Sequence, residues 1–345
     1  MSVPRRRAAL IALAAVGALL LFGCTSDDAD TASSDTESAE SPSAESPTES
    51  TVPAPEATTV AEVLALGRPV VLAHAGGENA HPHSTPYAFA ESVRAGVDVL
   101  DFDVRLSSDG VLMVQHDDTV DRTTDSTGNV AEMTAEELEA LDAAYWFTEQ
   151  CSACTDQPRD AYVLRGIRTG EVDPPEGYGA DDFGIARFED IVERYPDHVL
   201  NVEIKGSYPE SVPAAEELAR ILEEHDKQDA AIVTAFDDEL AEAFHELLPE
   251  VAITPGLAAM TEYVLQGTVP PAGRTILQIP PSYEGLEVLT PALVERAHAE
   301  GLVLWIWPNE REWENADGYT RLLDMGVDGI NAADPPVAVQ VVRAR

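Results

Sequence analysis

From Val70 to Asn331 the chain alternates short apolar runs with longer amphipathic segments, and this alternation restricts the fold more than any other feature. Apolar runs of about four to eight residues are typical of buried strands. Segments such as Thr85–Ala95, which is followed by Gly96, are typical of helices. About eight strand–helix units over roughly 270 residues favour a closed (β/α)₈ TIM barrel, an α/β fold, over an open parallel sheet.

The expected elements follow one another with a single long interruption. Strands are expected at 70–73, 97–106, 111–115, 199–204, 230–235, 251–253, 275–279, 302–307 and 327–331. Helices are expected at 85–95, 187–194, 211–224, 239–248, 262–266, 291–299 and 313–324, with a short one after the capping box Thr134–Glu137. The insertion Tyr145–Gly184 is too long for an ordinary connection, so it is either a lid over a pocket or a stabilising side lobe.

Charged residues lie on the strand expected at 97–106. Because side chains alternate along a strand, Asp101 and Asp103 share one face, and His116 comes at the end of the next apolar run. Carboxylates on a mostly buried strand are costly unless they are paired or bind a metal. The alternative is that both aspartates lie on a solvated face of the sheet.

Two other expected strand ends carry chemically matching groups. Val70–Ala73 leads into His74, and the strand 199–204 presents Glu203 and Lys205 two residues apart. The C-terminal ends of barrel strands converge on one mouth, so these groups and the two aspartates are expected to meet there. This mouth would then hold an acid, a base, a cation and candidate metal ligands together, which is typical of an active site.

Several short motifs then occur in one order along the chain. They are His74-Ala75-Gly76, Pro82-His83-Ser84-Thr85, Ala88-Phe89, Asp101-Phe102-Asp103, His116-Asp117, Arg122-Thr123-Thr124, Glu203-Ile204-Lys205, Gly326–Ile330 and Asp334-Pro335. Taken together, over about residues 69–341, they make the chain resemble the glycerophosphodiester phosphodiesterase family. The resemblance implies the same barrel fold, with a mouth that cleaves phosphodiesters.

The resemblance also implies a role for each candidate residue. The metal ligands would be Asp101, Asp103 and Glu203, and a set of oxygen ligands favours Ca²⁺ or Mg²⁺ over zinc. The alternative for Glu203 is an ion pair with Lys205 in place of a metal. His74 and His116 resemble the family's acid–base pair, and the sequence leaves open which of them is the base. Lys205 would hold a non-bridging phosphate oxygen.

The chain departs from the family pattern at three places. Ala75 replaces the arginine after the first histidine, His83-Ser84 replaces Glu-Asn, and Asp101 replaces a glutamate. These changes imply a subfamily that binds the phosphate group differently or that acts on a different diester substrate. A weak or inactive enzyme also remains open.

The leading functional expectation is metal-dependent hydrolysis of glycerophosphodiesters, such as glycerophosphocholine, to glycerol 3-phosphate and an alcohol. One alternative is an enzyme that acts on intact lipid or on a cell-wall polyol-phosphate polymer. The other is a non-catalytic, ligand-binding lipoprotein. The net charge of −42 argues against nucleic acid as a partner. The sequence leaves the oligomeric state open.

The N-terminal segment is typical of an exported protein. Basic Met1–Arg7 and apolar Ala8–Phe22 precede Cys24, so 1–24 resembles a bacterial lipoprotein signal with Cys24 as the lipidated residue. The alternatives are an unlipidated secreted protein and an uncleaved anchor. Residues 25–59 are predicted to be a disordered tether, and 60–345 the folded domain. The domain would then lie on the extracytoplasmic side of the cell membrane and meet the membrane only through its lipid anchor.

Two further cysteines, Cys151 and Cys154, lie in the insertion. In an exported protein a small structural disulfide is favoured over a redox pair, because no thioredoxin-like context surrounds the Cys-x-x-Cys spacing. A zinc site would need two more ligands, which the surrounding sequence does not offer.

Overall fold

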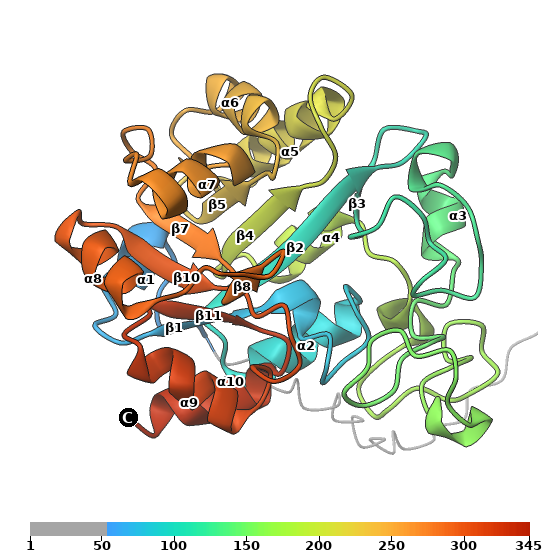
Figure 1. The fold of residues 1–345 in the computed structure, drawn as a ribbon. Helices are drawn as coiled ribbons and strands as arrows, with labels where there is room; N and C mark the ends of the chain where they lie inside the picture. Colours follow the sequence, from blue (N-terminus) through green and yellow to red (C-terminus); the bar gives the residue numbers. More distant parts are fainter. Residues whose placement is uncertain (1–53) are drawn as a thin grey trace, which may run out of the picture. The chain divides into compact units, whose positions relative to one another are not determined.

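The computed structural model describes residues 54–345, and eight parallel strands form a nearly closed barrel in this part of the chain (Figure 1). Their order is β6-β5-β4-β2-β1-β11-β10-β7, and the two end strands, β6 and β7, are not hydrogen-bonded to each other. The predicted (β/α)₈ TIM barrel is therefore confirmed, with one seam between β6 and β7.

The elements have the following bounds in the described residues. The strands are β1 Val70–Ala73, β2 Val99–Leu106, β3 Leu112–Val114, β4 Val199–Ile204, β5 Ala231–Thr234, β6 Ala252–Ile253, β7 Ile276–Ile279, β8 Ser282–Tyr283, β9 Leu286–Glu287, β10 Val303–Ile306 and β11 Gly329–Ala332. The helices are α1 Val60–Leu64, α2 Pro86–Ala95, α3 Ala135–Glu139, α4 Phe188–Arg194, α5 Val212–Glu224, α6 Asp238–Leu247, α7 Leu257–Gln266, α8 Pro291–Ala299, α9 Ala316–Asp324 and α10 Pro335–Arg343.

The inward faces of the strands change from apolar to polar along the barrel axis. One buried cluster joins Leu72, Val99 and Trp305 to Val63 of α1, which closes that end. Gly329 makes room for this layer, since a Cβ there would come within 2.7 Å of Trp305. Towards the C-terminal ends of the strands the inward positions become polar. One end of the barrel is therefore filled by packed apolar side chains, and the other is lined by side chains that can take part in chemistry.

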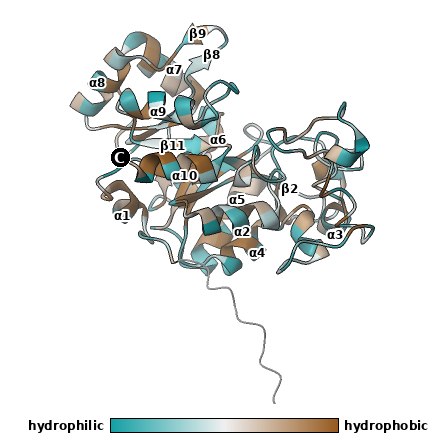
Figure 2. Cartoon of the chain, turned by 90° about the horizontal axis from the view of Figure 1, so that it is seen from below, coloured by the Kyte–Doolittle hydropathy of each residue, from teal (hydrophilic) through white to brown (hydrophobic). Residues whose placement is uncertain are grey.

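The outward faces of the strands pack against helices through a larger apolar cluster. The rings of Phe89 on α2 and Phe102 on β2 are 4.5 Å apart, and Phe188 of α4 lies 5.4 Å from Phe102. The helices in Figure 2 carry both hydrophobic and hydrophilic residues, as expected when one face covers a sheet. Helix α2 begins after the Thr85 cap and ends at Gly96 with φ 87°, as the sequence predicts.

One expected strand does not belong to the barrel. β3 pairs with β2 in the antiparallel direction, with Val104 opposite Val114, so it forms a hairpin on the barrel wall. The strand expected at 111–115 is therefore not one of the parallel strands of the barrel. The hairpin nevertheless returns the chain towards the mouth, because the Gln115 amide donates a hydrogen bond to the Asp103 carbonyl, 2.8 Å away.

The insertion Tyr145–Gly184 contains only two short 3₁₀ segments, Arg159–Ala161 and Ala180–Phe183. Within it the Sγ atoms of Cys151 and Cys154 form a disulfide. The Arg165 guanidinium stacks over three aromatic rings, and the nearest, Tyr162, is 3.8 Å away. These contacts give the insertion a small interior of its own.

The predicted signal 1–24, the lipidation site Cys24 and most of the predicted tether 25–59 lie outside the described residues. Residues 54–59 are described: Ala57 is buried, and the Thr59 side chain caps α1. Residues 57–59, which were expected to belong to the tether, thus pack with the barrel domain. No helix of residues 54–345 combines the length and apolar character needed to cross a membrane.

Candidate active site

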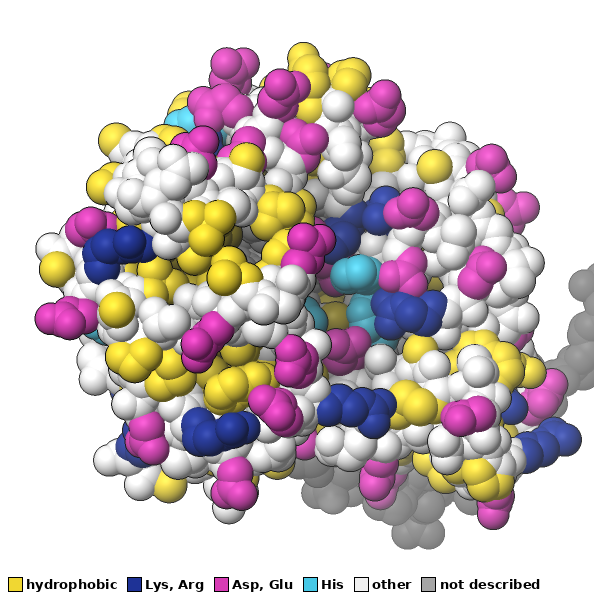
Figure 3. All heavy atoms as spheres, in the orientation of Figure 1, with side chains coloured by type: hydrophobic (Ala, Val, Ile, Leu, Met, Phe, Trp, Pro, Cys, Tyr) yellow, Lys and Arg dark blue, Asp and Glu magenta, His cyan; other side chains and the backbone are white. Residues whose placement is uncertain are grey.

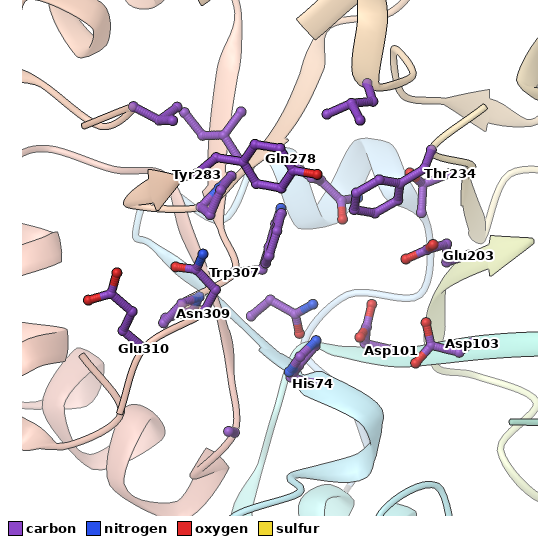
Figure 4. Close-up of a pocket in the computed structure, with 18 of the residues that line it drawn as sticks. His74, Asp101, Asp103, Glu203, Thr234, Gln278, Tyr283, Trp307, Asn309 and Glu310 are labelled. Atoms are coloured by element: carbon purple, nitrogen blue, oxygen red, sulfur yellow. The ribbon is translucent and has the colours of Figure 1, made fainter. Parts of the chain in front are cut away.

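A cavity of about 850 Å³ opens at the C-terminal ends of the barrel strands. It is lined by six of the residues expected to act in chemistry: His74, Asp101, Asp103, His116, Glu203 and Lys205. Figure 3 shows histidine side chains at a hollow in this face, beside acidic and basic ones. Figure 4 shows His74 and the three carboxylates on one side of the pocket, with Gln278, Tyr283 and Trp307 on the other.

The register between β2 and β4 brings two carboxylates together. Asp103 is the direct partner of Glu203, and the Lys205 Nζ lies 2.8 Å from Glu203 Oε1 and 3.3 Å from Asp103 Oδ1. Burial, together with the nearby Asp103 charge, raises the pKa of Glu203 to about 7. Burial opposes the charge of Asp103 as well, but Lys205 keeps the pKa of that carboxyl below its usual value.

Asp101 is held by a polar layer across the barrel. Asn201 donates to Asp101 Oδ1 at 2.5 Å, and Gln278 donates to Asn201 Oδ1 at 2.6 Å. The Ala75 amide also reaches Asp101 Oδ2, at 3.4 Å. Burial raises the pKa of Asp101. The two aspartates therefore share a face, as predicted, but have different neighbours.

His74 is presented by a tight turn at the end of β1. The turn holds Ala75, Gly76 and Gly77 at φ values of 46°, 79° and 90°. Glycine adopts such values without strain, and a Cβ at Gly77 would also come within 2.7 Å of the Pro335 ring. The turn brings the Glu78 carboxylate close to the His74 imidazole, so that Glu78 Oε1 lies 3.3 Å from His74 Nδ1. Burial opposes the imidazolium charge, but Glu78 and the nearby aspartates raise the pKa of His74 to about 10.

His116 is oriented by a different acid. Its Nδ1 lies 2.6 Å from Asp117 Oδ1, and Arg122 Nε donates to Asp117 Oδ2 at 2.5 Å. A histidine backed by a carboxylate that is itself fixed is a common arrangement for proton transfer. The two candidate histidines are thus each paired with a separate carboxylate.

Two groups at the site, Glu78 and His83, were not among the predicted functional residues. His83 is 5% exposed, its Nε2 lies 3.7 Å from Glu78 Oε2, and its ring centre is 6.1 Å from that of His116. Burial lowers the pKa of His83 to about 4. Ser152 of the insertion donates to Glu78 Oε2 at 3.3 Å, so the insertion contacts the site. The sequence feature that could have indicated a functional role for His83 is its position, because the family pattern has a glutamate there.

The donor set is suited to a hard divalent cation. Asp101, Asp103 and Glu203 offer carboxylate oxygens at one wall, and Glu203 and Asp103 already attract the Lys205 ammonium. The described part of the chain contains no cluster of three or more His, Cys, Asp or Glu side chains gathered closely enough to hold a metal. The three carboxylates would therefore have to come closer together to bind such an ion.

The chain is similar to proteins from several bacteria. It is 28% identical over 278 residues to a glycerophosphodiester phosphodiesterase of Caldanaerobacter subterraneus subsp. tengcongensis, covering 79% of this chain and 98% of the relative. It is 27% identical over 279 residues to a protein of the same name from Bacillus altitudinis, covering 79% and 97%. A glycerophosphoryl diester phosphodiesterase structure from Silicibacter pomeroyi aligns with a TM-score of 0.63 at 20% identity, covering 81% and 94%.

An Oleispira antarctica phosphodiesterase, whose structure is described as a complex with the product sn-glycerol-3-phosphate, aligns with a TM-score of 0.59 at 19% identity, covering 81% of this chain and 99% of the other. At that identity the likeness concerns the fold. The model of the glycerophosphoryl diester phosphodiesterase family matches residues 74–335, from the first site histidine to the start of the last helix. The predicted enzyme class, a phosphoric diester hydrolase, is thereby confirmed, and the chain belongs to the glycerophosphoryl diester phosphodiesterase family.

Proposed function

We propose that this chain hydrolyses glycerophosphodiesters, such as glycerophosphocholine, to glycerol 3-phosphate and an alcohol, in the metabolism of lipid headgroups. The observation that carries the proposal is the meeting of His74 and His116 with three carboxylates and Lys205 around one cavity. Phosphodiester hydrolysis needs a proton acceptor, a proton donor and positive charge, and these groups can supply all three.

The reaction is proposed to depend on Ca²⁺ or Mg²⁺ held by Asp101, Asp103 and Glu203. When bound, the cation would polarise the phosphoryl oxygen and favour ionisation of the attacking oxygen. Lys205 would neutralise a non-bridging phosphate oxygen. This role matters more here than in the family pattern, because Ala75 supplies no guanidinium.

The two histidines are proposed to move protons in opposite directions. His74, with its pKa raised to about 10 by Glu78 and the aspartates, carries a proton at neutral pH despite its burial. It is therefore assigned as the donor to the departing alcohol oxygen. His116, oriented by Asp117, is assigned as the acceptor from the attacking oxygen.

Glycerol 3-phosphate release from glycerophosphocholine, followed by mass spectrometry with the full chain, tests the proposal. We expect release with Ca²⁺ or Mg²⁺ and none with a chelator. Asp103→Asn should lower turnover at least about a hundredfold, because a bound cation is worth several kcal/mol of transition-state stabilisation, without changing the circular dichroism spectrum. The matched control is Asp181→Asn, since the Asp181 side chain is 96% exposed. Equal turnover by both variants would refute the assigned role of Asp103.

The same assay separates the alternative functions. A cyclic phosphate product would favour action on intact lipid or on a polyol-phosphate polymer through attack by a neighbouring hydroxyl. Thermal stabilisation by glycerophosphocholine with no product would favour a non-catalytic binding lipoprotein.

The exported, lipid-anchored location is a separate proposal that rests on the N-terminal sequence. It predicts that the protein takes up labelled palmitate in a bacterial host and that Cys24→Ser abolishes the label. Equal labelling of the variant would refute Cys24 as the lipidated residue.

A further inference from the structure

The insertion Tyr145–Gly184 reaches the active site through one short loop, 151–153, which lines the cavity beside the turn that follows β1. The Gln150 amide donates a hydrogen bond to the Asn79 carbonyl of that turn at 2.8 Å. The Asn79 amide in turn donates to the carbonyl of Ala333, directly after β11, also at 2.8 Å. The insertion, the turn after β1 and the end of β11 are therefore joined by hydrogen bonds at the edge of the cavity.

The loop that carries Ser152 is held in place from several sides. The disulfide between Cys151 and Cys154 closes it. The Thr148 amide donates to the Cys151 carbonyl at 3.0 Å, and the Cys151 amide donates to the Thr148 carbonyl at 2.9 Å. The Tyr162 hydroxyl donates to the Cys154 carbonyl at 2.7 Å. Ser152 lies between the two cysteines, so these contacts restrict where its hydroxyl can point.

The Ser152 hydroxyl leads to the first site histidine through one carboxylate. Ser152 Oγ donates to Glu78 Oε2 at 3.3 Å, and Glu78 Oε1 lies 3.3 Å from His74 Nδ1. His74 Nδ1 is buried and makes no hydrogen bond to any other described residue. Glu78 is therefore the group placed to hold the imidazole ring in one orientation.

The orientation of His74 decides which of its nitrogens can reach a substrate. When one ring nitrogen faces a carboxylate, the other is left to exchange protons. His74 lines the pocket shown in Figure 4, so with Nδ1 turned towards Glu78 it presents Nε2 to the substrate. A proton donor works only when it lies within hydrogen-bond reach of the oxygen that receives the proton.

We propose that Glu78 is a positioning residue that orients His74 as the proton donor, and that Ser152 of the insertion keeps Glu78 in place. This role rests on the proposed phosphodiesterase activity and on the assignment of His74 as the donor. As the bond between phosphorus and the departing alcohol oxygen breaks, the proton on His74 Nε2 passes to that oxygen. Glu78 acts only through His74. The insertion is then part of the active site, and more than a stabilising side lobe.

A comparison of two leaving groups tests the proposal. The full chain, with Ca²⁺ or Mg²⁺, is assayed on glycerophosphocholine, whose choline oxygen must gain a proton as it departs. It is also assayed on the p-nitrophenyl ester of glycerol 3-phosphate, whose p-nitrophenolate departs as an anion. Glu78→Gln should lower kcat for glycerophosphocholine about tenfold or more with little change in KM, because it loses part of the general acid catalysis. The loss of kcat on the p-nitrophenyl ester should stay below about threefold.

Two further variants separate orientation from packing. Glu78→Asp keeps the carboxylate and should recover part of the rate lost in Glu78→Gln. Ser152→Ala should show the same selective loss on glycerophosphocholine, of about fivefold, the effect of losing one hydrogen bond of ordinary strength. Glu176→Gln and Ser108→Ala are the matched controls, because both residues are exposed and neither lines the cavity. They should match the wild type on both substrates.

The outcomes distinguish this inference from the proposed function. Ser152→Ala removes only a hydroxyl at a half-buried loop position, so the comparison stands even if Glu78→Gln does not fold. Equal losses on the two substrates in the folded variants, or no loss on either, would overturn this inference alone. A wild-type chain that cleaves neither ester would overturn the proposed function, and with it this inference.

Discussion

Replacing Glu314 by glutamine should make the protein more stable at neutral pH. Glu314 is 7% exposed, and its Oε2 accepts hydrogen bonds from the Tyr319 hydroxyl at 2.5 Å and the Ala333 amide at 3.0 Å. Its Oε1 has no hydrogen-bond partner among the described residues. Burial raises the pKa of this carboxyl from 4.5 to about 7, although both hydrogen bonds favour the charged form. A glutamine would keep an oxygen for both donors without the charge.

The size of the effect follows from the shift in pKa. Below pH 4.5 the carboxyl is protonated in both the folded and the unfolded state, so it adds no pH dependence. Between 4.5 and about 7 only the folded state keeps the proton, so stability falls as the pH rises. At about 1.4 kcal/mol per pH unit, the loss is on the order of 3 kcal/mol by pH 7. Glu314→Gln should avoid this loss.

Urea unfolding followed by circular dichroism at half-unit steps from pH 4.5 to 7.5 measures the effect. The difference in unfolding free energy between Glu314→Gln and the wild type should grow in favour of the variant across this range. Glu312→Gln, at an exposed position two residues away, should show no such trend. A difference that stays constant with pH would show that burial does not raise the pKa of Glu314.

Three further substitutions test the packing and the site. Phe102→Ala removes a fully buried ring that lies 4.5 and 5.4 Å from two other phenylalanine rings, and should lower the unfolding free energy in urea by about 3–5 kcal/mol; a loss under 1 kcal/mol would contradict this packing. Gly329→Ala puts a Cβ within 2.7 Å of Trp305, so it should cost about 1–3 kcal/mol and change the tryptophan fluorescence; an unchanged spectrum and stability would contradict the contact. Lys205→Met removes the partly buried cation beside Asp103, and should lower kcat/KM for glycerophosphocholine about tenfold or more in steady-state assays. Wild-type kinetics in that variant would exclude Lys205 from phosphate binding.

Much of the site could be predicted because its main residues lie at strand ends. Alternation puts Asp101 and Asp103 on one face, and the convergence of parallel strands adds Glu203 and Lys205. Glu78 could not be found in this way. It contacts His74 only because the turn between them folds back through three left-handed residues. No regular period in the sequence encodes that reversal.

The sequence by itself determined the alternation of strands and helices between residues 70 and 331, the caps of α2 and α3, and the polar face of β2, but not helices α1 and α10 or the β8–β9 hairpin. These features depend on side chains a few residues apart, whose geometry is the same in any fold that contains the element. Only the tertiary structure decided that Asp103 pairs with Glu203, that the β2–β3 hairpin returns His116 to the mouth, and that apolar side chains of α7 and the β8–β9 hairpin share a cavity with them. Strand register and the meeting of distant loops depend on how the whole barrel packs, and that is a property of contacts between residues far apart in the chain.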